Sequence, residues 1–440
     1  MIILKQQKVS SRIMTNAKEG KVITVEVQYR QSDDWPRYSR QVLFWNWLTW
    51  IFNFVDRGLI GPLLPLMIPF FHLSLTAAGG LTSLFFVGYL STFLGGFISD
   101  KIGRKKVIGP SILGFGTVTG LTSIAGSVPV LAGIRILTGV FEGFQYPAGA
   151  AWVSETYPYA KRGKALAVWE TGYSLGTLLG IVLATLIAAH WGWRAPWPVS
   201  GALSLIAGIL LMVFVKERPR QETPGYQESM IMNRDPAPTF KEVWKKRNVW
   251  VVFILHGLYN FTFWMAGAWL PLYVIRVRHF SFVSGGLLSG VLFGGITLGL
   301  VLSGMVADKI GRVKSISFLS LISALVLLAF TRASSPVTLF ALIALGGIFG
   351  AYIPTAIALV TDTTNPMVSG TAFGIALFGA ELGAVLGPVT GGFIAQHFGL
   401  QTAMYFLPAS LFVASILVWL AKDSPVDVQQ KKNFVVPETL

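Results

Sequence analysis

Twelve apolar stretches, each of about 20 to 30 residues, decide what this chain can fold into. In lipid, every backbone N–H and C=O group must be bonded within the protein, and a helix meets that demand by itself. We therefore expect an all-α membrane protein with twelve transmembrane helices. The stretches occupy residues 42–71, 76–99, 107–126, 129–157, 164–190, 196–215, 247–275, 283–307, 313–331, 336–361, 369–396 and 401–421.

The basic residues indicate how the helices are threaded through the membrane. Only 12% of the 440 residues are charged, yet the formal net charge is +15. Of the 35 Lys and Arg residues, 29 lie in the tails and in the loops on the same side, and four lie in the opposite loops. Because basic residues favour the cytoplasmic side, we expect a multi-pass protein of the cell membrane with both termini cytoplasmic. The positive charge then reflects topology and argues against a nucleic-acid partner.

A repeated loop divides the chain into two halves. The sequence GGFISDKIGRKK (95–106) follows the second span, and SGMVADKIGRVK (303–314) follows the eighth. Both contain DKIGR, and their aspartates are 308 − 100 = 208 residues apart. Internal repeats of this kind are typical of transporters. We expect two pseudo-symmetric six-helix bundles (41–215 and 247–421), a cytoplasmic linker (216–246) and cytoplasmic tails (1–40 and 422–440).

The repeated loops have the composition of a clasp between helix ends. Glycines allow two helices to approach closely, the aspartates can cap helix ends, and the basic residues can pair with acidic groups on neighbouring helices. Such a clasp would hold one side closed in one state and release it in the other. The candidate gating residues are Gly96, Asp100, Gly103, Arg104, Gly304, Asp308, Gly311 and Arg312, with Glu155 and Arg162 at the end of the fourth span.

Four charged residues lie inside apolar spans: Asp56 and Arg57 in the first, Arg135 and Glu142 in the fourth. One central charge costs about 2.5–3.5 kcal/mol on insertion scales. The two signs balance, so the four could form an ion-pair cluster that only holds two helices together. Alternatively, an arginine could bind an anion while a carboxylate takes up a proton. Neighbours on a helix point about 100° apart, so Asp56 and Arg57 cannot both face one cavity.

These motifs resemble those of the major facilitator superfamily. The pattern G-x-x-x-D-x-x-G-R after spans 2 and 8 resembles its signature, and RILTGVFEGFQYPAGAAWVSETYPYAKRG (135–163) is similar to its fourth-helix pattern. The resemblance implies alternating access by two bundles, with helices 1, 4, 7 and 10 lining a central cavity. The four buried charges would then ring that cavity.

A narrower resemblance concerns the first and fourth spans. N-x-x-D-R in the first and R-x-x-x-x-x-x-E-x-x-x-x-P in the fourth resemble the anion:cation symporters. This implies proton-coupled symport of a small organic anion, a carboxylate or sugar acid. It implies that Arg57 binds the anion, that Asp56 and Glu142 exchange protons, and that Arg135 orients them. Spinster-type lysolipid or amphiphile carriers carry a similar pattern and are one alternative; a receptor that binds without translocating is another.

Further substrate contacts are expected on other spans. His256, Asn260 and Trp264 are spaced i, i+4, i+8 and share nearly one face of the seventh span. Tyr173 in the fifth span, Tyr352 in the tenth and Glu381 in the eleventh complete the candidates. For each, packing or a helix–helix hydrogen bond is the alternative role.

The sequence offers no basis for enzyme chemistry. It contains no cysteine, no G-x-x-x-x-G-K-[ST] phosphate loop and no His/Cys metal spacing. We therefore expect no enzyme, no cofactor and no metal. The expected partners are a small-molecule substrate, protons and the lipid bilayer, and we expect the protein to be a monomer.

Overall fold

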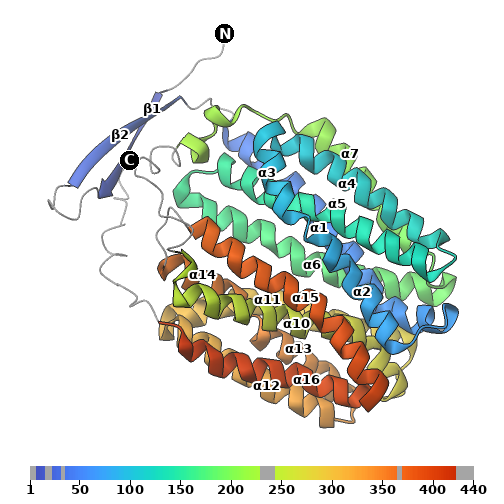
Figure 1. Cartoon of the computed structure of the whole chain (residues 1–440). Coiled ribbons are helices and arrows are strands. Elements are labelled where there is room, and N and C mark those ends of the chain that lie inside the picture. The colour runs from blue at the N-terminus through green and yellow to red at the C-terminus, as the bar shows by residue number, and fades with distance from the viewer. Residues whose placement is uncertain (1–5, 15–21, 31–34, 228–242, 364–368, 423–440) are drawn as a thin grey trace.

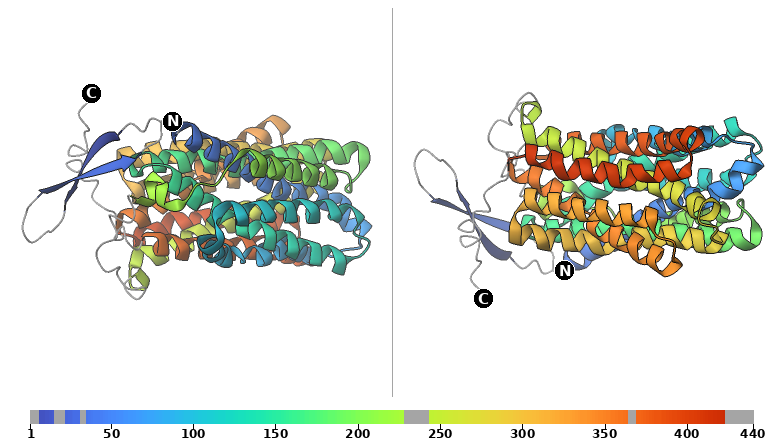
Figure 2. Two further views of the ribbon diagram at one scale, coloured as in Figure 1. Left: turned by 90° about the horizontal axis from the view of Figure 1, so that it is seen from above. Right: turned by 90° about the horizontal axis from the view of Figure 1, so that it is seen from below.

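The fold is a bundle of long helices that run roughly along one common direction (Figures 1 and 2). The computed structural model describes residues 6–14, 22–30, 35–227, 243–363 and 369–422. Within these ranges, twelve helical stretches are long and apolar enough to cross a membrane. The predicted all-α architecture with twelve spans is confirmed, and every span overlaps the stretch predicted for it.

The N-terminal half supplies the first six spans, which run from blue to green in Figure 1. The second is interrupted at Leu90 and Ser91, where sequence analysis predicted one continuous helix. The elements are α1 (Trp35–Phe70), α2 (Leu75–Tyr89), α3 (Thr92–Ile102), α4 (Arg104–Leu121), η1 (Thr122–Ile124), α5 (Val128–Thr156), α6 (Tyr159–Trp191) and α7 (Pro196–Phe214).

The C-terminal half supplies the other six spans, from yellow to red. Its fourth span is also interrupted, at Ala351 and Tyr352. The short helix η2 (Arg220–Glu222) belongs to the linker. The elements of this half are α10 (Arg247–Arg276), α11 (Phe282–Ile310), α12 (Arg312–Arg332), α13 (Pro336–Gly350), α14 (Ile353–Thr363), α15 (Ser369–Phe398), α16 (Leu400–Leu417) and η4 (Val418–Leu420).

The N-terminal tail differs from the prediction in two ways. Strands β1 (Gln6–Met14) and β2 (Val22–Arg30) form an antiparallel hairpin that lies outside the helical bundle (Figure 1). Their β-branched residues were a signal that sequence analysis did not use. The first helix also begins at Trp35, earlier than expected. The indole of buried Trp35 donates a hydrogen bond to the Thr156 carbonyl at 3.1 Å, which fixes the start of α1 against the end of α5.

The two halves meet closely near one end of the bundle. We call the end that carries both tails the tail end, and the opposite end the loop end. Helix α15 packs against α2, and α6 packs against α11. In the loop-end half, the Ser83 hydroxyl donates to the Val385 carbonyl at 2.6 Å, and the Leu75 amide donates to Gln396 Oε1 at 2.8 Å. A side chain on Gly79 would overlap the backbone of α15. The N-terminal and C-terminal halves are therefore closed against each other in the part of the bundle nearer the loop end.

Candidate functional site

Two buried ion pairs join α1 to α5. Arg57 Nε lies 2.8 Å from Glu142 Oε2, and Arg135 Nη1 lies 3.8 Å from Asp56 Oδ2. Asp56 and Glu142 are fully buried, and Arg57 is only 6% exposed. Each buried charge has a partner of opposite sign, which offsets much of the cost of removing it from water. The four charges predicted from sequence are thus brought together as two pairs within one bundle.

Arg57 is also held by a polar chain along α1 and α5. Its Nη2 donates to Asn53 Oδ1 at 2.9 Å. The Asn53 amide donates to Gln145 Oε1 at 3.0 Å, and the Gln145 amide donates to the Thr49 hydroxyl at 3.1 Å. All of these groups are buried. Sequence analysis assigned no role to Gln145 or Thr49, although Asn53 and Gln145 fell within quoted motifs.

Aromatic rings surround the Arg57 guanidinium. Its central carbon lies 4.1 Å from the Tyr89 ring centroid, 4.2 Å from Phe54 and 5.1 Å from Phe85. A cation at these distances is attracted by the negative faces of the rings. Tyr89 is the last residue of α2, next to the break in the second span. Sequence analysis missed Phe85 and Tyr89 because no spacing within one helix reveals contacts between helices, and it assigned no role to Phe54, which lies one turn before Arg57 in α1.

Several polar atoms of this charge cluster make no hydrogen bond to another described residue. Among the described residues, both carboxylate oxygens of Asp56, Nε and Nη1 of Arg135, and Oε1 of Glu142 have no hydrogen-bond partner. A buried polar group without a partner costs about 1–3 kcal/mol. Several polar atoms of the cluster are therefore left able to accept or donate a further hydrogen bond.

Arg57 borders a small cavity between the two halves, with a volume of about 10 Å³, near the lower limit for one water molecule. Of helices 1, 4, 7 and 10, which are expected to line the transport cavity, helices 1 and 7 border this small cavity, and of the four charges only Arg57 does. Asp56, Arg135 and Glu142 lie behind Arg57, because opposite charges pair within the bundle. The cavity is lined by Arg57, Gly58, Ile60, Gly61, Thr82, Thr177, Ile181, Trp264, Gly267, Ala268 and Phe293.

The three candidates on α10 are linked along one face, as predicted. The Trp264 indole donates to Asn260 Oδ1 at 3.1 Å, and the Asn260 amide donates to the His256 carbonyl at 3.1 Å. Trp264 alone of the three lines the cavity, where its ring packs 4.9 Å from that of Phe86. Of the three candidates on this helix, only Trp264 borders the cavity next to Arg57.

The remaining three candidate substrate contacts, on α6, α14 and α15 or beside them, differ in whether they adjoin the charge cluster. The Tyr352 hydroxyl donates to the Leu255 carbonyl at 2.8 Å inside the C-terminal half, so its donor is already used. The Tyr173 ring packs against Phe54 at 4.8 Å, next to Arg57. Glu381 of α15 is 8% exposed and interacts electrostatically with Arg57 across the interface. Tyr173 and Glu381 therefore adjoin the charge cluster, whereas Tyr352 belongs to the packing of its own half.

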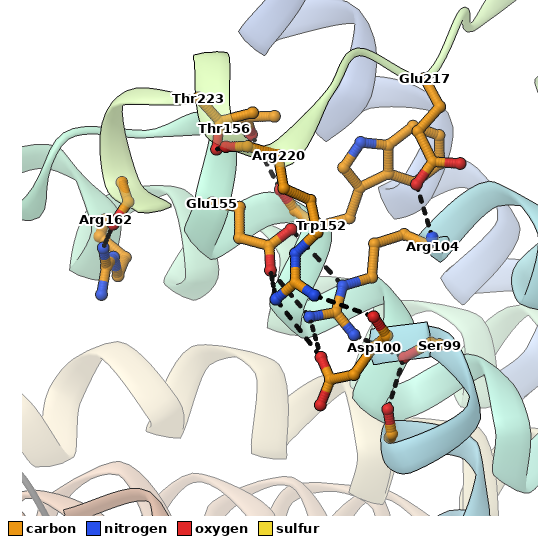
Figure 3. A network of polar contacts seen from close by, with 12 residues as sticks. Ser99, Asp100, Arg104, Trp152, Glu155, Thr156, Arg162, Glu217, Arg220 and Thr223 are labelled. Carbon is orange, nitrogen blue, oxygen red and sulfur yellow. Dashed lines mark hydrogen bonds and ion pairs between the residues drawn. The ribbon is translucent and has the colours of Figure 1, made fainter. Parts of the chain in front are cut away.

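At the tail end, the first repeated loop forms a charged network (Figure 3). Arg104 Nη2 lies 2.5 Å from Asp100 Oδ1 and 2.7 Å from Glu155 Oε1, while its Nη1 donates to the Ser99 hydroxyl at 2.5 Å. Arginine suits this position because its planar fork can bind two acceptors at once. The network ties the end of α3 to the end of α5.

The linker takes part in the same network, which sequence analysis did not predict. Glu217 accepts hydrogen bonds from the amides of Arg104 at 2.6 Å and Lys105 at 3.2 Å. Arg220 Nη2 lies 2.7 Å from Glu155 Oε1 and 3.4 Å from Asp100 Oδ1 (Figure 3). The linker thus anchors itself to the repeated loop. The contact depends on folding, because more than 100 residues separate Arg104 from Glu217.

Glycines have distinct roles in the two repeated loops. Gly103 and Gly311 adopt φ angles of +109° and +90°, which side chains disfavour, so each turn requires glycine. The expected close approach at Gly304 is not present, since no atom lies within 4 Å of where its Cβ would be. Gly96 has only ordinary contact with Pro147, and the tight contact falls to Gly95, against α5. Glycine density in the sequence did not reveal which positions touch.

Three further gating candidates also make contacts. Arg162 Nη2 donates to the Gly225 carbonyl of the linker at 2.9 Å. In the second repeat, Asp308 and Arg312 flank the turn at Gly311, as Asp100 and Arg104 flank Gly103, and both interact with other residues. The backbone turn of the repeat is therefore the same in both halves.

Replacing Arg104 with alanine is expected to destabilise the N-terminal half by about 1–3 kcal/mol, because the substitution removes a charged donor from buried acceptors. Arg220 still reaches Glu155, which limits the loss. Thermal unfolding of the purified protein in detergent measures the effect. Lys101→Ala, at an exposed position of the same loop, is the matched control. Equal unfolding temperatures for Arg104→Ala and Lys101→Ala would show that the network around Arg104 does not contribute to stability.

The chain is similar to several transporters over most of its length. It is 27% identical over 416 residues to a probable sulfoacetate transporter of Cupriavidus necator, covering 89% of this chain and 96% of the relative. It is 25% identical over 405 residues to a hexuronate transporter of Bacillus subtilis, covering 88% and 94%. It is 26% identical over 399 residues to a multidrug resistance protein of Proteus mirabilis, covering 88% and 97%.

Solved structures share the fold. A bacterial homologue of the human lysosomal transporter Spinster, in an inward-facing and occupied conformation, has a TM-score of 0.77 at 18% identity, covering 89% of this chain and 97% of that one. The family profile described as Major Facilitator Superfamily matches residues 47–318 and 286–438. These matches include both repeated loops and all four buried charges. The chain therefore belongs to the major facilitator superfamily.

Proposed function

We propose that this transporter moves a small organic anion, a carboxylate or sugar acid, across the cell membrane by proton-coupled symport. The observation that carries the proposal is the position of Arg57, a buried arginine that borders the cavity between the two halves. A guanidinium presents a rigid fork that matches a carboxylate or sulfonate. In this role the protein is a secondary transporter and not an enzyme.

The pairing of Arg57 with Glu142 provides a route for coupling. The Glu142 carboxylate, 2.8 Å from Arg57 Nε, competes with an incoming anion for the same guanidinium. When Glu142 binds a proton it becomes neutral, and Arg57 is free to bind the substrate. Binding of anion and proton then favour each other, and this coupling is reciprocal. Asp56 and Arg135 form a second pair that supports the same exchange one layer further from the cavity.

The relatives support an anion more than other substrates. The names of two of them specify sulfoacetate and hexuronate, which are both small organic anions. A drug exporter and a Spinster homologue also appear among the similar proteins. A neutral drug offers no anionic group for the Arg57 guanidinium to bind. The distribution of basic residues, with 29 of 35 on the side of the tails, supports cytoplasmic termini.

Uptake into proteoliposomes tests the proposal. Purified protein is reconstituted, and carboxylates, sugar acids and sulfonates are offered with and without an inside-alkaline pH gradient, the membrane potential being clamped. At least one of these anions is expected to accumulate above its external concentration only when the gradient is present. Accumulation of none of them, alongside transport of a lysolipid or a neutral drug, would refute the proposal.

A further inference from the structure

Three residues that do not line the cavity form a chain of hydrogen bonds that ends on Arg57. Asn53 and Thr49 precede Arg57 on α1 at four-residue spacing, so all three share one face of the helix. Gln145 of α5 lies across the helix interface and is bonded to both Asn53 and Thr49. The three side chains are buried, and none of them lines the cavity. Any effect of theirs on a substrate in the cavity must therefore pass through Arg57.

The direction of this chain is fixed at its Arg57 end. A guanidinium can only donate hydrogen bonds, so the Asn53 atom that lies 2.9 Å from Arg57 Nη2 must be the carbonyl oxygen. The Asn53 nitrogen then donates to Gln145 Oε1 at 3.0 Å. The Gln145 nitrogen in turn donates to the Thr49 hydroxyl at 3.1 Å. Each amide is thereby oriented by the group before it.

The direction is fixed equally at the opposite end. The Thr49 hydroxyl donates to the backbone carbonyl of Trp45 at 3.0 Å, and a carbonyl can only accept. The hydroxyl oxygen must therefore accept from Gln145, as the Arg57 end also requires. Reversal of either amide would bring two donors or two acceptors face to face in a buried site, where an unsatisfied polar group is costly. The chain accordingly has one stable orientation, with the Asn53 oxygen toward Arg57.

Arg57 is thus held by two partners of different kinds. The Glu142 carboxylate holds Nε through its charge, at 2.8 Å, and this interaction weakens when the carboxylate takes up a proton. The Asn53 amide is neutral and does not titrate, so its bond to Nη2 persists in both protonation states. Among the described residues, Oε1 of Glu142 has no hydrogen-bond partner, whereas both amide atoms of Asn53 are bonded.

We infer that Gln145 and Thr49 are positioning residues for the transported anion. Acting through Asn53, they keep the Arg57 guanidinium in its binding orientation while Glu142 is protonated. Without an acceptor at position 145, the Asn53 amide is free to turn its nitrogen toward the guanidinium, which then loses its second anchor. The anion meets a misplaced fork and binds more weakly, although the charge is still present. This inference rests on the proposed function and deepens it.

The test compares Gln145→Leu in two backgrounds. The readout is the apparent KM of counterflow in proteoliposomes, and the labelled probe is the carboxylate, sugar acid or sulfonate that the wild-type protein accumulates. In the wild-type background Glu142 still holds Arg57, so KM should rise only about threefold. In the Glu142→Gln background the charged partner is absent, and the same substitution should raise KM about tenfold. A general loss of folded protein would instead lower the maximal rate and leave KM unchanged.

A second pair of variants, made in the same Glu142→Gln background, tests the far end of the chain. Thr49→Val has nearly the same shape but leaves the Gln145 amide without an acceptor, so it should also raise KM. Thr49→Ser keeps the hydroxyl and should keep the KM of the parent protein. The matched control is Thr171→Val, which removes a bond between α1 and α6 that lies outside this chain: the Trp47 indole donates to the Thr171 hydroxyl at 2.9 Å. Its KM should not change.

Two results would overturn the inference. One is an unchanged KM for Gln145→Leu in both backgrounds. The other is the same KM for Thr49→Val and Thr49→Ser, a comparison that decides the question even where Gln145→Leu does not fold. Failure of the wild-type protein to transport any of the screened anions would refute the proposed function, and with it the premise of this inference.

Discussion

Substitution of Arg57 by alanine is expected to reduce anion counterflow about 100-fold or more. Truncating one member of a buried, hydrogen-bonded charge pair costs about 2–5 kcal/mol, and each 1.4 kcal/mol is a factor of ten. Arg57 would be the cation that the substrate contacts, and of the four buried charges it alone borders the cavity. Counterflow of radiolabelled anion in proteoliposomes measures the loss.

Two companion variants separate this effect from misfolding. Arg57→Ala leaves Glu142 without its partner, which is expected to destabilise the protein by about 3–5 kcal/mol. The double variant Arg57→Ala/Glu142→Gln removes that unpaired charge and should recover most of the stability, but no transport. Arg57→Lys keeps the charge without the fork and should transport weakly. If the double variant transported at the wild-type rate, Arg57 would not be the anion site.

Glu142→Gln is expected to keep substrate exchange and to lose accumulation driven by the pH gradient. Glutamine is neutral, so it no longer competes with the anion for Arg57, and the anion can bind or leave without a proton. The coupling then slips, whatever other proton sites remain. Counterflow and gradient-driven uptake, measured on the same proteoliposomes, give the two values that must be compared.

A second acid variant serves as the control for Glu142→Gln. Glu170 is a half-buried acid of α6 that takes no part in either ion pair, so Glu170→Gln should retain full accumulation. Fluorescence of a pH dye inside the vesicles adds an independent readout, since Glu142→Gln should admit anion without acidifying the vesicle interior. Normal accumulation by Glu142→Gln would exclude this carboxylate as the coupling site.

Much of the architecture could be predicted because lipid imposes simple rules on sequence. A span must be apolar over its whole length, so its limits are visible along the chain without knowledge of its neighbours. The repeated DKIGR loops located the two halves in the same way. The hairpin in the N-terminal tail was missed because it lies outside the apolar spans. The interruption at Leu90 and Ser91 was missed because it does not change the apolar character of the second span.

The candidate site was predicted in its residue types but not in its arrangement. Asp56, Arg57, Arg135 and Glu142 stood out because each is costly in lipid. Their pairing, by contrast, depends on how α1 and α5 are rotated against each other. The same is true of the linker: Glu217 and Arg220 look like ordinary surface charges until folding places them on Arg104.

The sequence by itself determined the number of spans, the two-half organisation and the presence of buried charge, since each follows from the cost of polar groups in hydrocarbon. Only the tertiary structure decided that Arg57 borders the cavity while its ion-pair partners in the same half do not. The reason is that helix rotation and contact are set by side-chain packing between segments distant in the chain. No local pattern records that packing.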